Sequence, residues 1–160
     1  MTTKLPPNLL NTGAVIDRAY AEYTANANLS ATIPRDNSIP QVTEGTQILS
    51  VTITPKSVAN RLRVRFNGQF AGSGNYSMMA VFVNGATNAV AAKYHYNGGG
   101  ASGGDEGFLE FEFVPGSTSA QTITVRVGPD SGTIRMNGTS SGAMLGGVIM
   151  SALVVEEIQA

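Results

Sequence analysis

Near its end the chain runs Gly147-Val148-Ile149-Met150-Ser151-Ala152-Leu153-Val154-Val155-Glu156-Glu157-Ile158, and this run predicts a β-strand that is apolar on both faces. Successive side chains of a strand point to opposite faces of its sheet. The two faces consist of Val148, Met150, Ala152 and Val154 on one side, and of Ile149, Leu153 and Val155 on the other. An antiparallel sheet in a lone domain usually keeps one face in water. This strand therefore needs two apolar neighbours, its own core and a second surface, for which another copy of the chain is the simplest.

The composition favours many short strands joined by turns. The 160 residues suffice for one domain with a sizeable core. There are 19 glycines, and glycine costs about 1 kcal/mol inside a helix. A net charge of −1 argues against nucleic-acid binding, which needs clustered cations. The absence of cysteine excludes disulfides and thiolate metal sites.

The sequence contains no targeting or membrane segment that we recognise. Residues 1–7 lack the apolar core of a signal peptide, and no run reaches the roughly 18 apolar residues of a membrane helix. We expect a protein made in a cytosol, with no membrane insertion. If it acts outside the cell, it leaves by a route other than standard secretion, such as lysis.

From Leu29 onward the pattern predicts eight or nine strands and no long helix. In residues 61–70, Leu62, Val64 and Phe66 alternate with arginines. An antiparallel β-sandwich, most economically a jelly roll, accounts for such strands. The predicted strands are residues 47–54, 61–70, 77–83, 88–96, 108–114, 122–127, 133–136 and the final run.

The N-terminal part is predicted to be separate from this sandwich. Residues 1–14 hold Pro6-Pro7 and several turn formers, which indicates an arm or linker. For residues 15–24 a short helix and an extended segment both remain open. We therefore divide the chain into an N-terminal attachment arm, residues 1–28, and a jelly-roll domain, residues 29–160.

Residues 77–83 and 148–155 are the two predicted strands with apolar side chains on both faces. We expect both to lie in the sheet that packs against neighbouring subunits, because obligate homo-oligomer contacts are apolar and bury roughly 2,000 Å² or more. A closed dimer and a closed trimer both satisfy this expectation. The predicted interface residues are Met79, Val81, Met150, Leu153 and Val155.

Two parts of the sequence carry a resemblance to a known family. The first is Ile-Pro-Gln-Val-Thr-Glu-Gly-Thr-Gln-Ile-Leu (39–49), continued by Val-Thr-Ile-Thr-Pro-Lys-Ser (51–57) and Asn-Arg-Leu (60–62). The second combines Asn137-Gly138, Gly146-Gly147 and residues 153–158. Over residues 28–158 the chain resembles the receptor-binding domains of fibres and spikes on tailed phages and phage-like gene transfer particles.

The resemblance implies a jelly roll similar to tumour necrosis factor, assembled as a homotrimer that displays a carbohydrate-binding surface. It favours the trimer over the dimer, and a location on a virion that is made in the bacterial cytoplasm and released by lysis. The chain departs from long fibres because it has no coiled coil or shaft. A short knob with an attachment arm, on head or tail, is the form expected.

The glycine-rich loop after residues 88–96 is the expected site. Sugar rings stack their C–H faces on aromatic rings, and amides and carboxylates bond their hydroxyl groups. Tyr94, Tyr96, Asn97, Asp105 and Glu106 therefore form a candidate carbohydrate site. The competing interpretation places the tyrosines in a subunit interface, where tyrosine is common.

The sequence supports a catalytic site less well than a carbohydrate-binding site. His95 is the only histidine, so a Ser-His-Asp triad has to use it, with Asp105 or Glu106 as the orienting acid; we favour a strand-end histidine without a catalytic role. Glu110 and Glu112 are two residues apart on a strand, which places them on its outer face opposite the arginines of residues 61–65. We expect cross-strand ion pairs there, although the arginine row also suits an acidic polysaccharide.

These expectations combine into a non-enzymatic virion knob that binds host surface polysaccharide for attachment. It needs no cofactor and no metal, and its arm joins it to other virion proteins. The alternative is a purely structural cap or decoration protein without receptor binding. A polysaccharide-cleaving enzyme needs a close acid pair or triad, which the sequence does not present.

Overall fold

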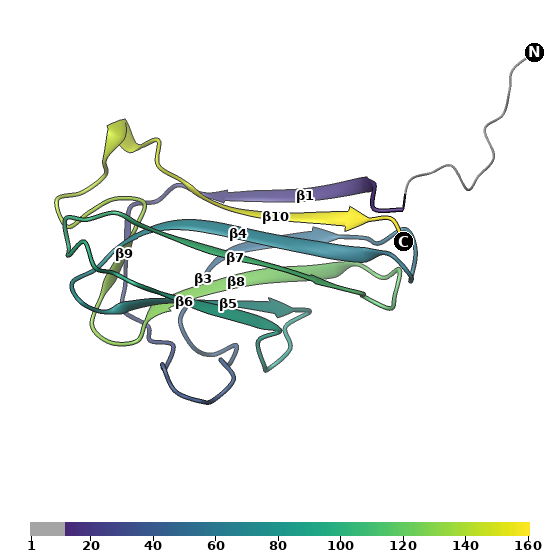
Figure 1. Ribbon diagram of the computed structural model, residues 1–160, viewed down its shortest axis with the longest axis horizontal. Helices are drawn as coiled ribbons and strands as arrows, with labels where there is room; N and C mark the ends of the chain where they lie inside the picture. Colours follow the sequence, from purple (N-terminus) through teal and green to yellow (C-terminus); the bar gives the residue numbers. More distant parts are fainter. Residues whose placement is uncertain (1–11) are drawn as a thin grey trace, which may run out of the picture.

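The computed structural model describes residues 12–160. This part of the chain contains ten β-strands (Figure 1). A short 3₁₀ turn, η2 (Leu145–Gly147), precedes the last strand. The strands are β1 (Val15–Tyr23), β2 (Ala27–Leu29), β3 (Thr46–Ile53), β4 (Arg61–Ala71), β5 (Tyr76–Val83), β6 (Ala91–Tyr96), β7 (Asp105–Phe113), β8 (Gln121–Pro129), β9 (Ile134–Met136) and β10 (Ser151–Ile158). The prediction of an all-β chain is confirmed.

The strands form two antiparallel sheets that pack face to face (Figure 1). Sheet I has the order β1-β10-β4-β7, and β9 and β2 extend it beyond the end of β10. Sheet II has the order β3-β8-β5-β6. Apart from the short β2 and β9 and the β5–β6 hairpin within sheet II, successive strands alternate between the sheets, which is the jelly-roll topology. The predicted antiparallel sandwich is confirmed.

Alternating side chains of both sheets build the core. On β4, Leu62, Val64 and Phe66 are fully buried, as the sequence predicts, while the arginines between them lie on the outer face. Val125 and Ile123 of β8 meet them from sheet II. Each strand thus presents one apolar face to the centre of the sandwich.

The second apolar face of β5 is covered by the chain itself. Residues 30–45, called the covering segment here, connect β2 to β3 and run along the outside of sheet II (Figure 1). Ile33 of this segment is buried against Met78, Ala80 and Phe82. Ile33 N–H donates to Pro129 O of β8 at 3.0 Å, and Gly45 N–H donates to Thr32 O at 2.9 Å, so the segment is fixed to β8 and its two ends are held together. No neighbouring subunit is needed to bury this face.

Four of the five predicted interface residues are wrong. Met79 and Val81 point from β5 into the sandwich core, and Leu153 and Val155 point into it from β10. All four are at most 1% exposed in the single chain, so none can touch a neighbouring subunit. Met150 differs, because it lies before the start of β10 and is 48% exposed.

The predicted boundary of the attachment arm at residue 28 is also wrong. β1 pairs with β10 along its length, from Val15↔Ile158 to Tyr23↔Ser151, and β2 pairs with β9. Residues 15–29 therefore belong to the sandwich. Of the proposed arm, residues 1–11 lie outside the described residues.

Candidate functional site

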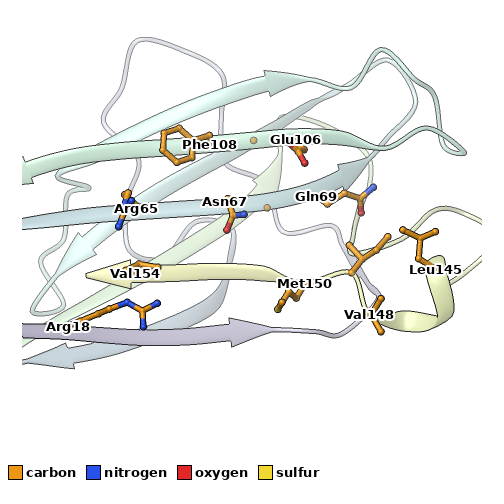
Figure 2. Close-up of a pocket in the computed structure, with 13 residues that line it drawn as sticks. Arg18, Arg65, Asn67, Gln69, Glu106, Phe108, Leu145, Val148, Met150 and Val154 are labelled. Atoms are coloured by element: carbon orange, nitrogen blue, oxygen red, sulfur yellow. The ribbon is translucent and has the colours of Figure 1, made fainter. Parts of the chain in front are cut away.

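The outer face of sheet I carries an open groove of about 810 Å³ (Figure 2). We call it the sheet I groove. Its floor is built by β4, β7 and β10, and the segment around η2 closes one end. The residues that line it are Arg18, Arg65, Asn67, Gly68, Gln69, Glu106, Gly107, Phe108, Leu145, Val148, Ile149, Met150 and Val154.

The η2 end of the groove is apolar and open to solvent. Leu145 is 76% exposed and Val148 75% exposed. Both lie on the segment that precedes β10, at the same end of the groove as Met150 (Figure 2). Phe108, on the opposite wall, is half exposed. Exposed apolar side chains gathered on one face mark an interaction surface.

Ion pairs cover the rest of this face, as the sequence predicts. Arg63 Nε lies 2.8 Å from Glu112 Oε1, and Arg61 Nε lies 3.1 Å from Glu112 Oε2. The Glu112 carboxylate raises the pKa of Arg63 because it accepts a hydrogen bond from the guanidinium. Arg65 Nη2 pairs with Glu156 Oε2 at 2.8 Å. Glu112 is thus engaged by two guanidinium groups, and together with Glu110 it does not form the free acid pair of a glycosidase.

The outer face of sheet II carries a group of three tyrosines, called the tyrosine platform. The Tyr76 ring lies 5.6 Å from that of Tyr94 and 5.1 Å from that of Tyr96, centre to centre. Tyr94 is 62% exposed and Tyr96 52% exposed. The Arg35 guanidinium carbon lies 4.2 Å above the centre of the Tyr76 ring, on the side of the covering segment. The group therefore offers aromatic surface and charged groups to the same ligand.

The register of β5 and β6 creates this platform. Tyr76 pairs with Tyr96 and Met78 with Tyr94, so all three tyrosines project from the outer face. Asp130 at the end of β8 holds both partners of the cation–π pair. Its Oδ1 accepts the Tyr76 N–H at 2.9 Å, and its Oδ2 lies 3.6 Å from Arg35 Nε. Tyr76, Arg35 and Asp130 were missed by the sequence interpretation. Tyr76 reaches the other tyrosines through the β5–β6 register, and Arg35 and Asp130 reach Tyr76 through the course of the covering segment and the end of β8.

The five predicted carbohydrate-binding residues do not form one site. Tyr94 and Tyr96 lie together on the platform, but Asn97 is fully buried. Its amide accepts from Ser77 Oγ at 3.0 Å and donates to Asn75 Oδ1 at 3.0 Å, so it supports the loop instead of a ligand. Asp105 and Glu106 both lie on β7 of sheet I. Asp105 faces His95 of β6, whereas Glu106 lines the sheet I groove and also borders, with Tyr94, a depression between β6 and β7.

His95 and Asp105 face each other between the edges of the two sheets, where β6 and β7 border a depression of about 420 Å³. His95 Nε2 lies 3.5 Å from Asp105 Oδ1. Ser77 is the cross-strand partner of His95, but its hydroxyl is fully buried and donates to Asn97. The three residues therefore do not present a nucleophile to a substrate.

Residues 12–160 hold no cluster of three or more His, Asp or Glu side chains with the spacing of a metal site. None of the helical elements in this part of the chain is long and apolar enough to cross a membrane.

No family model matches the chain, and no curated protein matches its sequence. Among solved structures, it is similar to dimeric latent PorU from Porphyromonas gingivalis, with a TM-score of 0.43 and 10% identity over 93% of this chain and 14% of that one. It is also similar to the insecticidal delta-endotoxin Cry8Ea1 from Bacillus thuringiensis, with a TM-score of 0.38 and 13% identity over 87% of this chain and 19% of that one. The cycloalternan-forming enzyme from Listeria monocytogenes gives a TM-score of 0.34 and 8% identity over 84% of this chain and 11% of that one. The chain thus spans less than a fifth of each of these proteins, and at these TM-scores the likenesses support no argument about function.

Proposed function

We propose that the chain is a non-enzymatic, homotrimeric knob of a phage or phage-like particle, and that it binds host surface carbohydrate for attachment. The observation that carries this proposal is the tyrosine platform, in which Tyr94 and Tyr96 present exposed rings beside Arg35 and Asp130. The particle itself is suggested by the resemblance of residues 28–158 to fibre and spike domains.

The platform suits a sugar better than an apolar ligand. A pyranose ring has an apolar C–H face, which packs on an aromatic ring, and a rim of hydroxyl groups, which need donors and acceptors. Binding sites of this kind combine aromatic surface with a few fixed polar groups. Arg35 is held from two sides, by the Tyr76 ring and by the Asp130 carboxylate, so its donors lie at the Tyr76 end of the platform.

The sheet I groove supports the assembly part of the proposal. Leu145, Val148 and Met150 stand exposed on the same face as Phe108 and Tyr20. Contact with neighbouring copies would bury them, and it would leave the platform, on the opposite sheet, open to the host. Three platforms on one trimer would gain avidity on a repetitive polysaccharide. The same exposed face also favours the second candidate, a structural cap that assembles on the particle without binding a receptor.

Binding to immobilised bacterial polysaccharides, compared between the wild-type chain and Tyr94→Ala, tests the carbohydrate proposal. We expect binding by the wild type and at least about a tenfold loss in the variant. Ser50→Ala, on the exposed outer face of β3, is the control. Absence of binding to both polysaccharides and host cells would reject receptor binding and leave the structural cap.

Sedimentation of the wild type and of Val148→Glu tests the assembly. We expect a trimer for the wild type and a folded monomer for the variant, because the glutamate would place a charge in the apolar contact. A wild-type chain that remains monomeric at high concentration would contradict the homotrimer.

A further inference from the structure

A second groove continues the tyrosine platform along β6. It has a volume of about 360 Å³ and lies between the outward tip of the covering segment, residues 36–40, and residues 89–92. Ala92 lines this groove, and Ala92 and Tyr94 are consecutive outward residues of β6. The groove and the platform are therefore parts of one surface. We call it the β6 track.

The track is longer than a single sugar ring. Ala92, Tyr94 and Tyr96 lie in one row, and at 3.3 Å per residue the row from Ala92 to Tyr96 measures about 13 Å. The groove beyond Ala92 adds further length, because it continues to Val90 and Ala89. The side chain of Ala92 is one methyl group, so no tall side chain separates the groove from Tyr94.

The wall of the track is fixed and polar. Ala89 N–H donates to Pro40 O at 2.9 Å, and Gln41 Nε2 donates to Asn88 Oδ1 at 2.9 Å, which ties the covering segment to the start of β6. Asp36 accepts the Ser38 N–H at 2.7 Å, and the hydrogen bonds from Ser38 lower the pKa of the Asp36 carboxyl. Asp36, Asn37 and Ser38 thus supply acceptors and donors along one side, at positions held by the backbone.

We propose that the β6 track binds a linear polysaccharide across several consecutive sugar units, with its chain running along β6. Successive units stack on Tyr96 and Tyr94, and the next units lie in the groove against residues 36–40. This inference rests on the proposed carbohydrate binding and adds the class of ligand, an internal stretch of a linear chain. A site for a single terminal sugar needs a pocket that encloses most of the ligand, whereas the track is open along its row.

Affinity as a function of chain length tests the inference. The probes are cello-, malto- and chito-oligosaccharides and oligogalacturonides of one to six units, together with polysaccharide fragments from bacteria that bind the knob, and the measurement is titration calorimetry. In any series that binds, we expect affinity to rise about tenfold or more between one and four units. Equal affinity for the monosaccharide and the hexamer would overturn the inference but leave carbohydrate binding intact.

Two matched arginine variants locate the contact. Ala92→Arg places a long side chain between Tyr94 and the groove, and Ala86→Arg places the same side chain on the exposed turn of the same hairpin. We expect Ala92→Arg to abolish the rise in affinity with oligosaccharide length and Ala86→Arg to retain it. Both variants should have the same melting curve, which shows that both are folded. Unchanged chain-length dependence in Ala92→Arg would overturn the inference. Absence of binding to every probe in the wild type would instead reject the proposed function.

Discussion

β5 and the run into β10 both carry apolar side chains on two faces, but the second apolar face is buried on β5 and exposed on the run into β10. On β5 that face is closed by Ile33 and the covering segment, so Met78, Ala80 and Phe82 are all buried. On the run into β10, nothing within residues 12–160 closes the face, and Val148 and Met150 stand exposed beside the half-buried Ala152 and Val154.

The difference shows what a doubly apolar strand can and cannot predict. For β5 the prediction of two apolar neighbours is confirmed, and for the run into β10 the second neighbour stays a prediction. The pattern does not say whether the second neighbour is a distant part of the same chain or another molecule. For β5 the neighbour precedes the strand by more than thirty residues, and for β10 we propose a second copy.

The largest loss of stability is expected from Leu153→Glu, because this substitution places a charge in the sandwich core. We expect a loss of roughly 4 kcal/mol or more in the free energy of unfolding, enough to prevent folding of a marginal domain. Met150→Glu is the matched variant on the exposed side, and we expect it to keep the fold. Urea unfolding followed by circular dichroism measures both, and equal loss in the two variants would contradict the assignment of the faces.

A smaller effect is expected where the covering segment closes β5. Ile33→Ala removes the buried side chain that fills the outer face, with an expected loss of about 2–4 kcal/mol. Ile39→Ala, on the exposed tip of the same segment, should change stability by less than about 0.5 kcal/mol. An Ile33→Ala variant as stable as the control would contradict the packing of the covering segment against β5.

The ion pairs on the outer face of sheet I should contribute less than either apolar contact. Glu112→Gln removes the partner of Arg61 and Arg63. All three side chains are partly exposed, so we expect a slight fall in the urea midpoint at low salt and none at 1 M salt. A loss that persists at high salt would show that the carboxylate does more than pair with arginine.

The smallest expected effect on stability comes from a pH-dependent ion pair on β1, the edge strand beside β10. Lys56 Nζ lies 2.7 Å from Asp17 Oδ2, and this hydrogen bond is the main reason that the pKa of Asp17 is below its ordinary value of 3.8. The contribution of the pair to stability is therefore present above about pH 4 and lost as the pH falls through the folded-state pKa. The midpoint difference between the wild type and Asp17→Asn should be small at pH 6 and vanish toward pH 2. A difference that does not change with pH would reject this pair as its source.

The sequence alone predicted which residues point into the core and which point outward wherever the two faces of a strand alternate strictly. The inward and outward residues of β4, and of β10 from Ala152 to Val155, follow the predicted faces. The cross-strand pairing of Arg63 with Glu112 also follows from the row of arginines and the row of glutamates. These features depend on neighbours within a strand or on one pairing.

The candidate site was less predictable because it depends on register and on a distant segment. A two-residue turn at Asn84-Gly85 would set Tyr76 opposite Lys93, whereas the longer connection sets it opposite Tyr96. That shift by three residues places Tyr76 beside both exposed tyrosines. β1 was left open between a helix and an extended segment, because it is an edge strand with the small Ala19 and Ala21 on its inner face, which gives a weak alternation.

The pairing of β1 with β10 also joins the two ends of the described chain. Gly13 N–H donates to Gln159 O at 2.8 Å, and Gln159 N–H donates to Ala14 O at 2.9 Å, at one pole of the sandwich (Figure 1). A short peptide bridge would close the backbone into a ring without moving a strand, and proteins with adjacent ends tolerate such circular permutation. New ends cut at the exposed Gly85 or Gly116 turns would then let a fused domain emerge from a different side of the sandwich, while the β6 track stays intact.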